Sequence, residues 1–210
     1  LGRMLQIHSP TGMTDDIVAF VCNELKNFGV TFDLTRRGAI RAELPGKRHT
    51  PDRAVAVHVD TLGAMVKEIK DNGRLAVVAV GHWSSRFAEG ARVTVHGDDG
   101  KSWRGTILPQ KASGHTYNAE IDSQPVDWVQ LEVRLDARVA NKADVVAAGV
   151  NIGDLIAVDT NAEFTDSGFV VSRHLDDKAG VASVLAMIKA VMENRLELPV
   201  NCHVIFTIAE

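Results

Sequence analysis

The strongest constraint on the fold is a change of pattern in the middle of the chain. Between residues 65 and 160, short β-rich segments replace the longer periodic patterns on either side. Asp-Asn-Gly at 71–73 and Asp-Asp-Gly at 98–100 are typical of β-hairpin turns. Six strands are expected, at residues 65–69, 75–80, 92–96, 103–108, 129–135 and 155–159. Such a succession of short strands predicts a small β-barrel or β-sandwich.

Helical and mixed patterns flank this β-rich region. Apolar residues recur at helical spacing after Thr14, a residue suited to cap a helix, and again between residues 181 and 192. Short runs of strand-forming residues predict strands at 30–34, 39–44, 54–57 and 203–207. The run at 54–57 reads Ala-Val-Ala-Val, which favours a strand buried on both faces.

The order of these patterns predicts an α/β protein in which one domain interrupts another. Residues 1–64 and 161–210 are expected to form a three-layer α/β domain with a mixed sheet, and residues 65–160 a small all-β domain inserted into it. The chain starts at Leu1 inside an apolar pattern and ends at Glu210, directly after a strand-like run. We therefore expect the α/β domain to be incomplete at its C-terminal end.

Composition argues against several classes of protein. The formal net charge of −4 lacks the basic excess of nucleic-acid-binding domains, so no nucleic acid is expected as a partner. No apolar run approaches the roughly 18–20 residues that span a bilayer, so no membrane partner is expected. The two cysteines, Cys22 and Cys202, stand far apart in apolar stretches, which favours buried free thiols and a cytoplasmic protein.

A His-x-Asp pair closes the apolar run at 54–57. His58 and Asp60 are two residues apart, so on a strand their side chains point the same way. Open α/β sheets place their ligands at the carboxyl ends of strands. A neutral imidazole suits Zn²⁺, and a neighbouring carboxylate can orient the ring. The pair is therefore either part of a metal site or a hydrogen-bonded polar pair at the end of a strand.

Two further carboxylate motifs lie at the edges of predicted elements. Asp176 and Asp177 directly precede a helix, where they can cap its first N–H groups or, as one carboxylate can, bridge two metal ions. Glu210 follows a predicted strand. It has the chemistry of a general base that acts on a metal-bound water, and the alternative is an ordinary surface Glu.

Together these segments resemble the signatures of the co-catalytic zinc aminopeptidases, which include the tetrahedral dodecameric, glutamyl and deblocking aminopeptidases. The resemblance rests on His-x-Asp-x-x-Gly at 58–63, Leu-Asp-Asp-Lys-Ala-Gly at 175–180 and Phe-Thr-Ile-x-Glu at 206–210. Ser-Pro-Thr-Gly at 9–12 is also similar to the loop that begins their catalytic domain. The resemblance covers essentially the whole chain, including the inserted β region.

The resemblance implies a role for each site residue. His58 and Asp176 would be metal ligands, with Asp176 bridging two divalent ions, Zn²⁺ or Co²⁺. Glu210 would be the catalytic base in amide-bond hydrolysis, and Asp60 would orient His58. The family's second Glu would stand at position 211 and further Asp and His ligands would follow it, so residues 1–210 hold only part of such a site.

The same resemblance implies the substrate and the assembly. The substrate would be a peptide that loses N-terminal residues, or a small dipeptide-like molecule, and the protein would be a homo-oligomer whose inserted domain makes dimer contacts. The chain also resembles one branch of this family, which is found with synthesis of the osmolyte N-acetylglutaminylglutamine amide. That likeness lies in Thr-Arg-Arg-Gly-Ala-Ile-Arg at 35–41 and Trp-Ser-Ser-Arg-Phe-Ala-Glu-Gly at 83–90.

Two alternative functions remain open. A related deacylase or carboxypeptidase of the same clan has only a short gap between its His-x-Asp pair and its bridging Asp. Here 118 positions separate His58 from Asp176 (176 − 58), which favours the aminopeptidase branch. The other alternative is a non-catalytic assembly module of the same fold, which a Glu at position 211 would argue against.

Residues 1–210 alone are expected to be inactive and to hold metal weakly, because zinc sites normally take at least three protein ligands. Without metal, we expect Asp176 or Glu210 to take up a proton or to reach toward Lys178.

Overall fold

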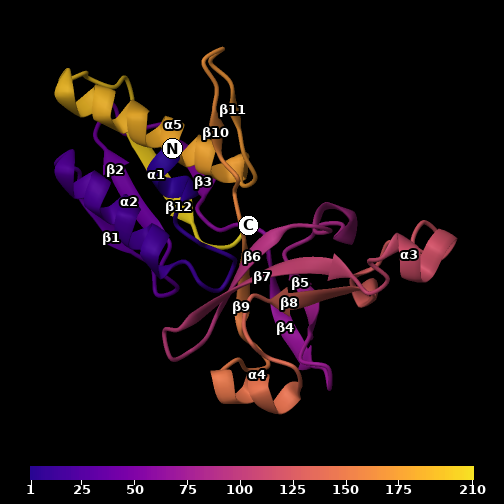
Figure 1. Ribbon diagram of the computed structural model, residues 1–210. Helices are drawn as coiled ribbons and strands as arrows, with labels where there is room; N and C mark the ends of the chain where they lie inside the picture. Colours follow the sequence, from indigo (N-terminus) through magenta and orange to yellow (C-terminus); the bar gives the residue numbers. More distant parts are fainter. The chain divides into compact units, whose positions relative to one another are not determined.

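The computed structural model describes all residues from 1 to 210. The chain divides into two compact units (Figure 1). Leu1–Thr61 and Thr160–Glu210 form the α/β unit, and Leu62–Asp159 form the barrel unit.

The α/β unit contains the helices and strands that the flanking patterns predict. Its helices are α1 (Gly2–Leu5), α2 (Asp15–Asn27) and α5 (Leu175–Glu193). Its sheet strands are β1 (Phe32–Leu34), β2 (Ile40–Leu44), β3 (Arg53–His58) and β12 (Cys202–Thr207). A short hairpin that the sequence did not predict, β10 (Glu163–Phe164) with β11 (Val170–Val171), precedes α5.

Helix α2 shows how local sequence produces these elements. Asp15 and Asp16 lie in its first turn, where they favour the positive end of the helix dipole. One face buries Ile17, Val21, Cys22 and Leu25. Thr14 does precede the helix, but its side chain makes no cap hydrogen bond.

The sheet is mixed, as predicted, with the strand order β1-β2-β12-β3. Strand β12 pairs antiparallel with β2 and parallel with β3. In the parallel pair, His58 lies opposite Thr207. The two strands therefore end at the same edge of the sheet, and the residues that follow β12 start beside His58.

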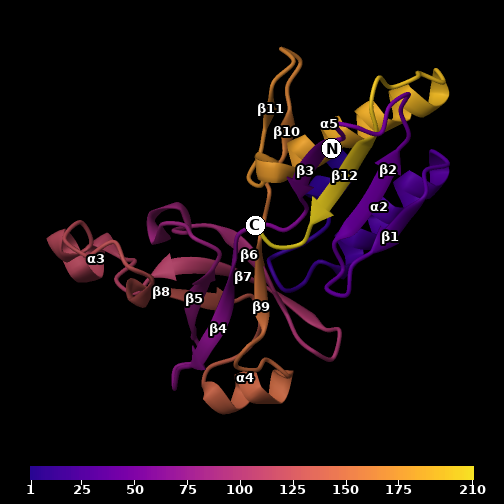
Figure 2. The same cartoon turned by 180° about the vertical axis from the view of Figure 1, so that it is seen from behind.

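The helices cover only one face of this sheet. Alternate strand residues share that face and pack with apolar side chains of α1, α2 and α5; they are Ile40, Ala42, Leu44, Cys202, Val204 and Phe206. On the opposite face, Arg41, Glu43 and Ala56 are exposed, and the view from behind shows β12 uncovered (Figure 2). Residues 1–210 thus form two layers rather than the three predicted, because no helix within them packs on the second face.

The strand at 54–57 also differs from its prediction. β3 is an edge strand, and Ala54 and Ala56 are exposed, so it is not buried on both faces. Alanine is small enough to be tolerated on an exposed face, and a run of Ala and Val therefore does not distinguish one buried face from two.

The barrel unit contains all six predicted strands, which close into an antiparallel barrel. The strands are β4 (Gly63–Ile69), β5 (Leu75–Val80), β6 (Arg92–His96), β7 (Ser102–Pro109), β8 (Leu131–Leu135) and β9 (Leu155–Val158). Their order is β4-β5-β8-β7-β6-β9, and β9 pairs back onto β4. Two short helices, α3 (Gly114–Tyr117) and α4 (Lys142–Ala148), were not predicted, so the unit is mainly rather than entirely β.

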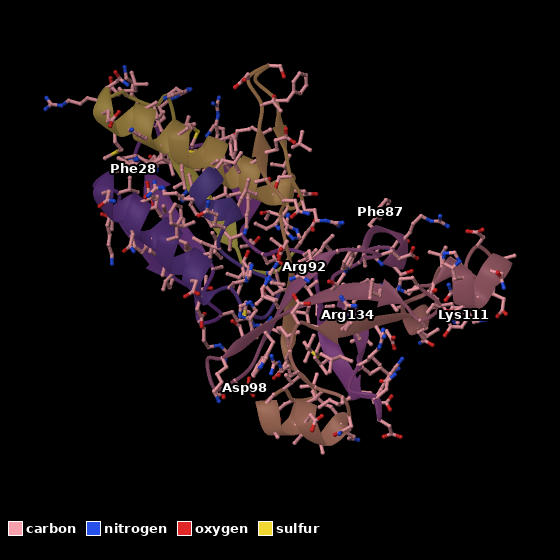
Figure 3. The ribbon with its side chains drawn as sticks, viewed as in Figure 1. Phe28, Phe87, Arg92, Asp98, Lys111 and Arg134 are labelled. Carbon is pink, nitrogen blue, oxygen red and sulfur yellow. The ribbon has the colours of Figure 1, made fainter.

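Charged side chains link neighbouring segments on the surface of the barrel unit. Arg92, labelled in Figure 3, donates from Nη1 to Thr106 Oγ1 at 2.8 Å and from Nη2 to Asp136 Oδ2. Arg104 donates to Asp159 and, at 2.6 Å, to Thr94 Oγ1. Such solvent-accessible pairs each contribute little to stability, on the order of 0–1 kcal/mol.

Cys22 and Cys202 are buried free thiols, as predicted, and burial raises the pKa of each. None of the helices combines the length and the apolar character that crossing a bilayer requires.

Asp154 is a buried carboxylate in the barrel unit, and its negative charge destabilises the folded state. It is 3% exposed in the turn before β9, where its Oδ2 accepts a hydrogen bond from Asn151 N at 2.8 Å. Burial raises the pKa of its carboxyl, the Asn151 hydrogen bond opposes that rise, and the charges of Asp98 and Asp99 add to it. The folded state therefore binds this proton more tightly than the unfolded state. The free energy of unfolding falls as the pH rises from the unfolded pKa through the folded one, and it stays lower at neutral pH.

Asp154→Asn keeps an acceptor for Asn151 and removes the buried charge. We expect the variant to be more stable than wild type at pH 7, because it no longer buries a carboxylate charge. The gain should shrink as the pH is lowered toward about 4, near the unfolded pKa of an Asp. Urea denaturation at several pH values measures both effects, and a variant that is less stable at pH 7 contradicts the prediction.

Candidate functional site

Residues singled out in the sequence meet at the carboxyl edge of the sheet in the α/β unit. His58 is the last residue of β3, Asp176 lies at the start of α5, and Glu210 follows β12. His58 Nε2 lies 3.1 Å from Asp176 Oδ1 and 3.7 Å from Glu210 Oε2. These three side chains therefore converge, although they are far apart in the sequence.

The other ring nitrogen of His58 faces Asp60. His58 Nδ1 lies 3.2 Å from Asp60 Oδ1 and 3.1 Å from Asp60 O. A carboxylate and a carbonyl only accept hydrogen bonds, so they favour a proton on Nδ1 and leave the lone pair on Nε2 when the ring is neutral. This is the contact that an orienting role for Asp60 requires.

The surrounding carboxylates stabilise positive charge at His58. Burial disfavours the charged ring and lowers its pKa. The hydrogen bond with Asp176 and the charges of Asp60 and Glu210 raise the pKa by more, so the pKa of His58 is raised overall. A group of anions that favours a proton at this point also favours a metal cation there.

Thr11 holds Asp60 from the other side, a contact that was not predicted. Thr11 Oγ1 donates to Asp60 Oδ2 at 2.6 Å, and Asp60 is only 3% exposed. Main-chain hydrogen bonds place the Thr11 loop beside the end of β3, from Thr11 N to Thr61 O and from Thr61 N to Ser9 O. The Ser-Pro-Thr-Gly sequence at 9–12 marks the loop, but nothing in it indicates the partner of Thr11.

Asp176 and Asp177 have different partners. The side chain of Asp176 contacts the His58 ring and is otherwise open to solvent, with 86% of its surface exposed. Asp177 Oδ2 instead accepts a hydrogen bond from His58 N at 3.2 Å. The peptide bond between the two Asp residues is cis. Asp177 thus binds the end of β3.

Lys178 joins the start of α5 to the N-terminal segment. It is 1% exposed, and its Nζ donates to Met4 O at 3.0 Å and to Ile7 O at 2.6 Å. Burial lowers the pKa of Lys178 to about 8. The expectation that Asp176 or Glu210 reaches toward Lys178 is wrong, because main-chain carbonyls already bind its ammonium group.

The donor set fits part of a metal site. Two ligands that each lie roughly 2.0–2.2 Å from one tetrahedral zinc ion are about 3.3 Å apart. His58 Nε2 and Asp176 Oδ1 are separated by a similar 3.1 Å. Residues 1–210 nevertheless contain no group of three or more His, Cys, Asp or Glu side chains that could hold a metal ion. His58 and Asp176 therefore have the spacing of two ligands of one ion, but by themselves they do not make up such a group.

The sequence matches a known family over most of its length. The model of the M42 glutamyl aminopeptidase family matches residues 38–210. The putative aminopeptidase YhfE of Bacillus subtilis (strain 168) is 37% identical over 201 residues, which cover 96% of this chain and 58% of that protein. The glutamyl aminopeptidase of Lactococcus lactis subsp. cremoris (strain MG1363) is 24% identical, over 94% of this chain and 55% of its own.

Solved structures share the fold. The TET aminopeptidase of the marine sediment archaeon Thaumarchaeota archaeon SCGC AB-539-E09 superposes with a TM-score of 0.87 at 20% identity, over 99% of this chain and 57% of its own. The TET1 peptidase of Pyrococcus horikoshii superposes with a TM-score of 0.80 at 23% identity, over 98% of this chain and 58% of its own. The chain thus spans little more than half the length of these four proteins.

The hydrogen bond between Thr11 and Asp60 can be tested by stability. Thr11→Val removes the hydroxyl and keeps the shape, so one oxygen of a buried carboxylate loses its donor. We expect the free energy of unfolding to fall by about 1.5–3 kcal/mol, the range for hydrogen bonds to charged groups. Thr11→Ser keeps the donor and should lose less than about 1 kcal/mol. Urea denaturation measures both variants, and equal stability of the two refutes the contact.

Proposed function

We propose, because the chain belongs to the M42 glutamyl aminopeptidase family, that it carries part of the catalytic centre of a metal-dependent aminopeptidase. The observation that supports this is the group formed by the imidazole of His58 and the carboxylates of Asp176 and Glu210, at 3.1 Å and 3.7 Å from it. Since the chain spans 58% of its Bacillus subtilis relative, we assign the activity to a polypeptide that also carries the remaining donors.

His58 and Asp176 are the proposed metal ligands. The contacts of Asp60 with His58 Nδ1 leave the lone pair of Nε2 directed at the site. Asp176 is exposed, so its second oxygen is accessible to a second ion. When bound, two divalent ions, Zn²⁺ or Co²⁺, would polarise the scissile carbonyl and lower the pKa of the attacking water.

Glu210 is the proposed general base. Its carboxylate lies on the Nε2 side of His58, as Asp176 does, and is 74% exposed, so a water molecule can reach it. It would accept a proton from the attacking water and return that proton to the leaving amine. Asp60 would orient His58 in this scheme, because its two oxygens contact His58 Nδ1 and Thr11 Oγ1.

The proposed substrate is the N-terminal residue of a peptide or a small dipeptide-like molecule. The sequence likeness at 35–41 and 83–90 adds, as a further proposal, a place beside the synthesis of N-acetylglutaminylglutamine amide. The peptide bond of either substrate suits the proposed chemistry, since metal-assisted hydrolysis acts on a carbonyl with an amine leaving group. The two free buried thiols favour a reducing compartment, and we place the protein in the cytoplasm.

The test of activity compares the longest polypeptide that the gene encodes with the 210-residue chain. Both are assayed with Zn²⁺ or Co²⁺ against aminoacyl amides, short peptides and N-acetylglutaminylglutamine amide. We expect chelator-sensitive hydrolysis by the longer form only. Glu210→Gln should lower kcat by about 10²–10⁴-fold, as expected for loss of a general base, with metal affinity little changed.

Matched variants make the assignment of ligands specific. His58→Ala should lower metal affinity, whereas His203→Ala should not, because His203 lies elsewhere on the sheet beside Asp52. Full activity of Glu210→Gln contradicts the proposed base. Release of an N-acyl group or of a C-terminal residue favours the deacylase or carboxypeptidase alternative, and metal binding without any hydrolysis favours an assembly module.

We also propose that the barrel unit acts as an inserted domain through which copies of the chain associate. Pyrococcus horikoshii TET1 peptidase, which shares the fold, assembles into a tetrahedron or a large octahedral shell. We expect a dimer or larger species in size-exclusion chromatography with light scattering. Deletion of residues 65–160, replaced by a short Gly-Ser linker, should give a monomer, and a wild-type protein that is monomeric at all concentrations contradicts the proposal.

A further inference from the structure

We infer that Asp177 is a positioning residue that fixes His58 against Asp176 through the main chain of β3, and that Gly180 is required for it to do so. The inference rests on the proposed function, because it assigns a purpose to the geometry of that site. Asp177 contacts the main chain of His58 and not its ring, so it is distinct from the proposed metal ligands.

The pairing of β3 leaves one N–H group at the site without a partner in the sheet. Val59 N donates to Thr207 O of the neighbouring strand. Successive N–H groups of a strand point to opposite sides, so His58 N points to the free edge of β3. Asp177 Oδ2 accepts from it at 3.2 Å. A carboxylate thus completes the hydrogen bonding at the residue that bears the imidazole.

The backbone at the start of α5 makes this contact feasible. Asp176 (φ −83°, ψ 109°) and Asp177 (φ −118°, ψ 27°) depart from helical geometry. Consecutive side chains therefore leave the chain in different directions, Asp176 toward the His58 ring and Asp177 toward the His58 main chain. Lys178, bound to two carbonyls of the N-terminal segment, anchors the next residue. One hydrogen bond consequently restrains both partners of the 3.1 Å contact between His58 and Asp176.

Gly180 provides the space for the Asp177 carboxylate. A Cβ atom at position 180 would lie 2.0 Å from Asp177 Oδ1 and 2.7 Å from Asp177 Cγ, well inside any real contact distance. Glycine is otherwise one of the least favourable residues within a helix. Its presence in the first turns of α5 is explained if the carboxylate must fold back over the helix at this point.

The test combines four variants. Asp177→Leu removes the acceptor at similar size, and Asp177→Asn keeps an acceptor oxygen without the charge. Gly180→Ala displaces the carboxylate without altering it. Ser183→Ala is the control, an alanine substitution in the same helix at an exposed residue whose hydroxyl binds only Ala179 O.

The first readout is hydrogen exchange of the His58 amide, measured by NMR on the metal-free 210-residue chain. Loss of a charge-assisted hydrogen bond should speed exchange by about tenfold or more in Asp177→Leu and Gly180→Ala. Asp177→Asn and Ser183→Ala should stay within about threefold of wild type, since both keep the acceptor. Circular dichroism checks folding, and Gly180→Ala keeps the test decisive if Asp177→Leu does not fold.

The second readout is Zn²⁺ affinity of the longest encoded polypeptide, measured by competition with a chelator. We expect a loss of about 10–100-fold in Asp177→Leu and Gly180→Ala, the range for residues that orient a metal ligand, and near-complete rescue in Asp177→Asn. An Asp177→Asn variant as weak as Asp177→Leu would show that Asp177 is itself a ligand and overturn the inference.

The experiments distinguish a failure of the inference about Asp177 from a failure of the proposed function. Unchanged His58 exchange in Asp177→Leu and Gly180→Ala overturns the inference whatever the enzyme does. Absence of metal-dependent hydrolysis in the wild type sinks the proposed function, while the exchange result still decides whether Asp177 positions His58.

Discussion

The parallel pairing of β3 with β12 is the constraint on which the candidate site depends. Parallel strands end at the same edge of a sheet, so His58 and the residues after β12 meet although 152 positions separate His58 from Glu210 (210 − 58). A shift of β3 by one residue would turn the imidazole to the other face of the sheet. Val204 and Phe206, both fully buried, lock β12 onto the helical layer and so maintain this register.

The N-terminal segment connects the parts of the site that the sheet does not reach. Thr11 holds Asp60 at the end of β3, and Lys178 binds the carbonyls of Met4 and Ile7 from the start of α5. Burial of an ammonium group is costly, and hydrogen bonds to two carbonyl oxygens offset part of that cost. The same short segment thus reaches both the His58 side and the Asp176 side of the site, which explains why polar contacts concentrate around it.

Most of the fold follows from patterns that can be read along the chain. Apolar residues at helical spacing mark α2 and α5, and turn residues between short β-rich runs mark the six barrel strands. The shortest elements could not be predicted in this way. Helix α4 has seven residues, too few for a clear period, although its Asn141 cap and the left-handed Gly149 after it were visible signals. Strands β10 and β11 have only two residues each.

The sequence by itself identified the candidate site residues, because His58, Asp60, Asp176 and Glu210 stand at the ends of recognisable elements. Only the tertiary structure decided how they are held. Whether the Ala-Val run at 54–57 is covered on one face or two depends on helices that pack from elsewhere, and the run itself is the same in both cases. The partners of Thr11, Asp177 and Lys178 were equally undetermined. Each lies more than 45 positions away in the chain, and a long-range hydrogen bond forms only where the pairing of the strands leaves a particular donor or acceptor unsatisfied.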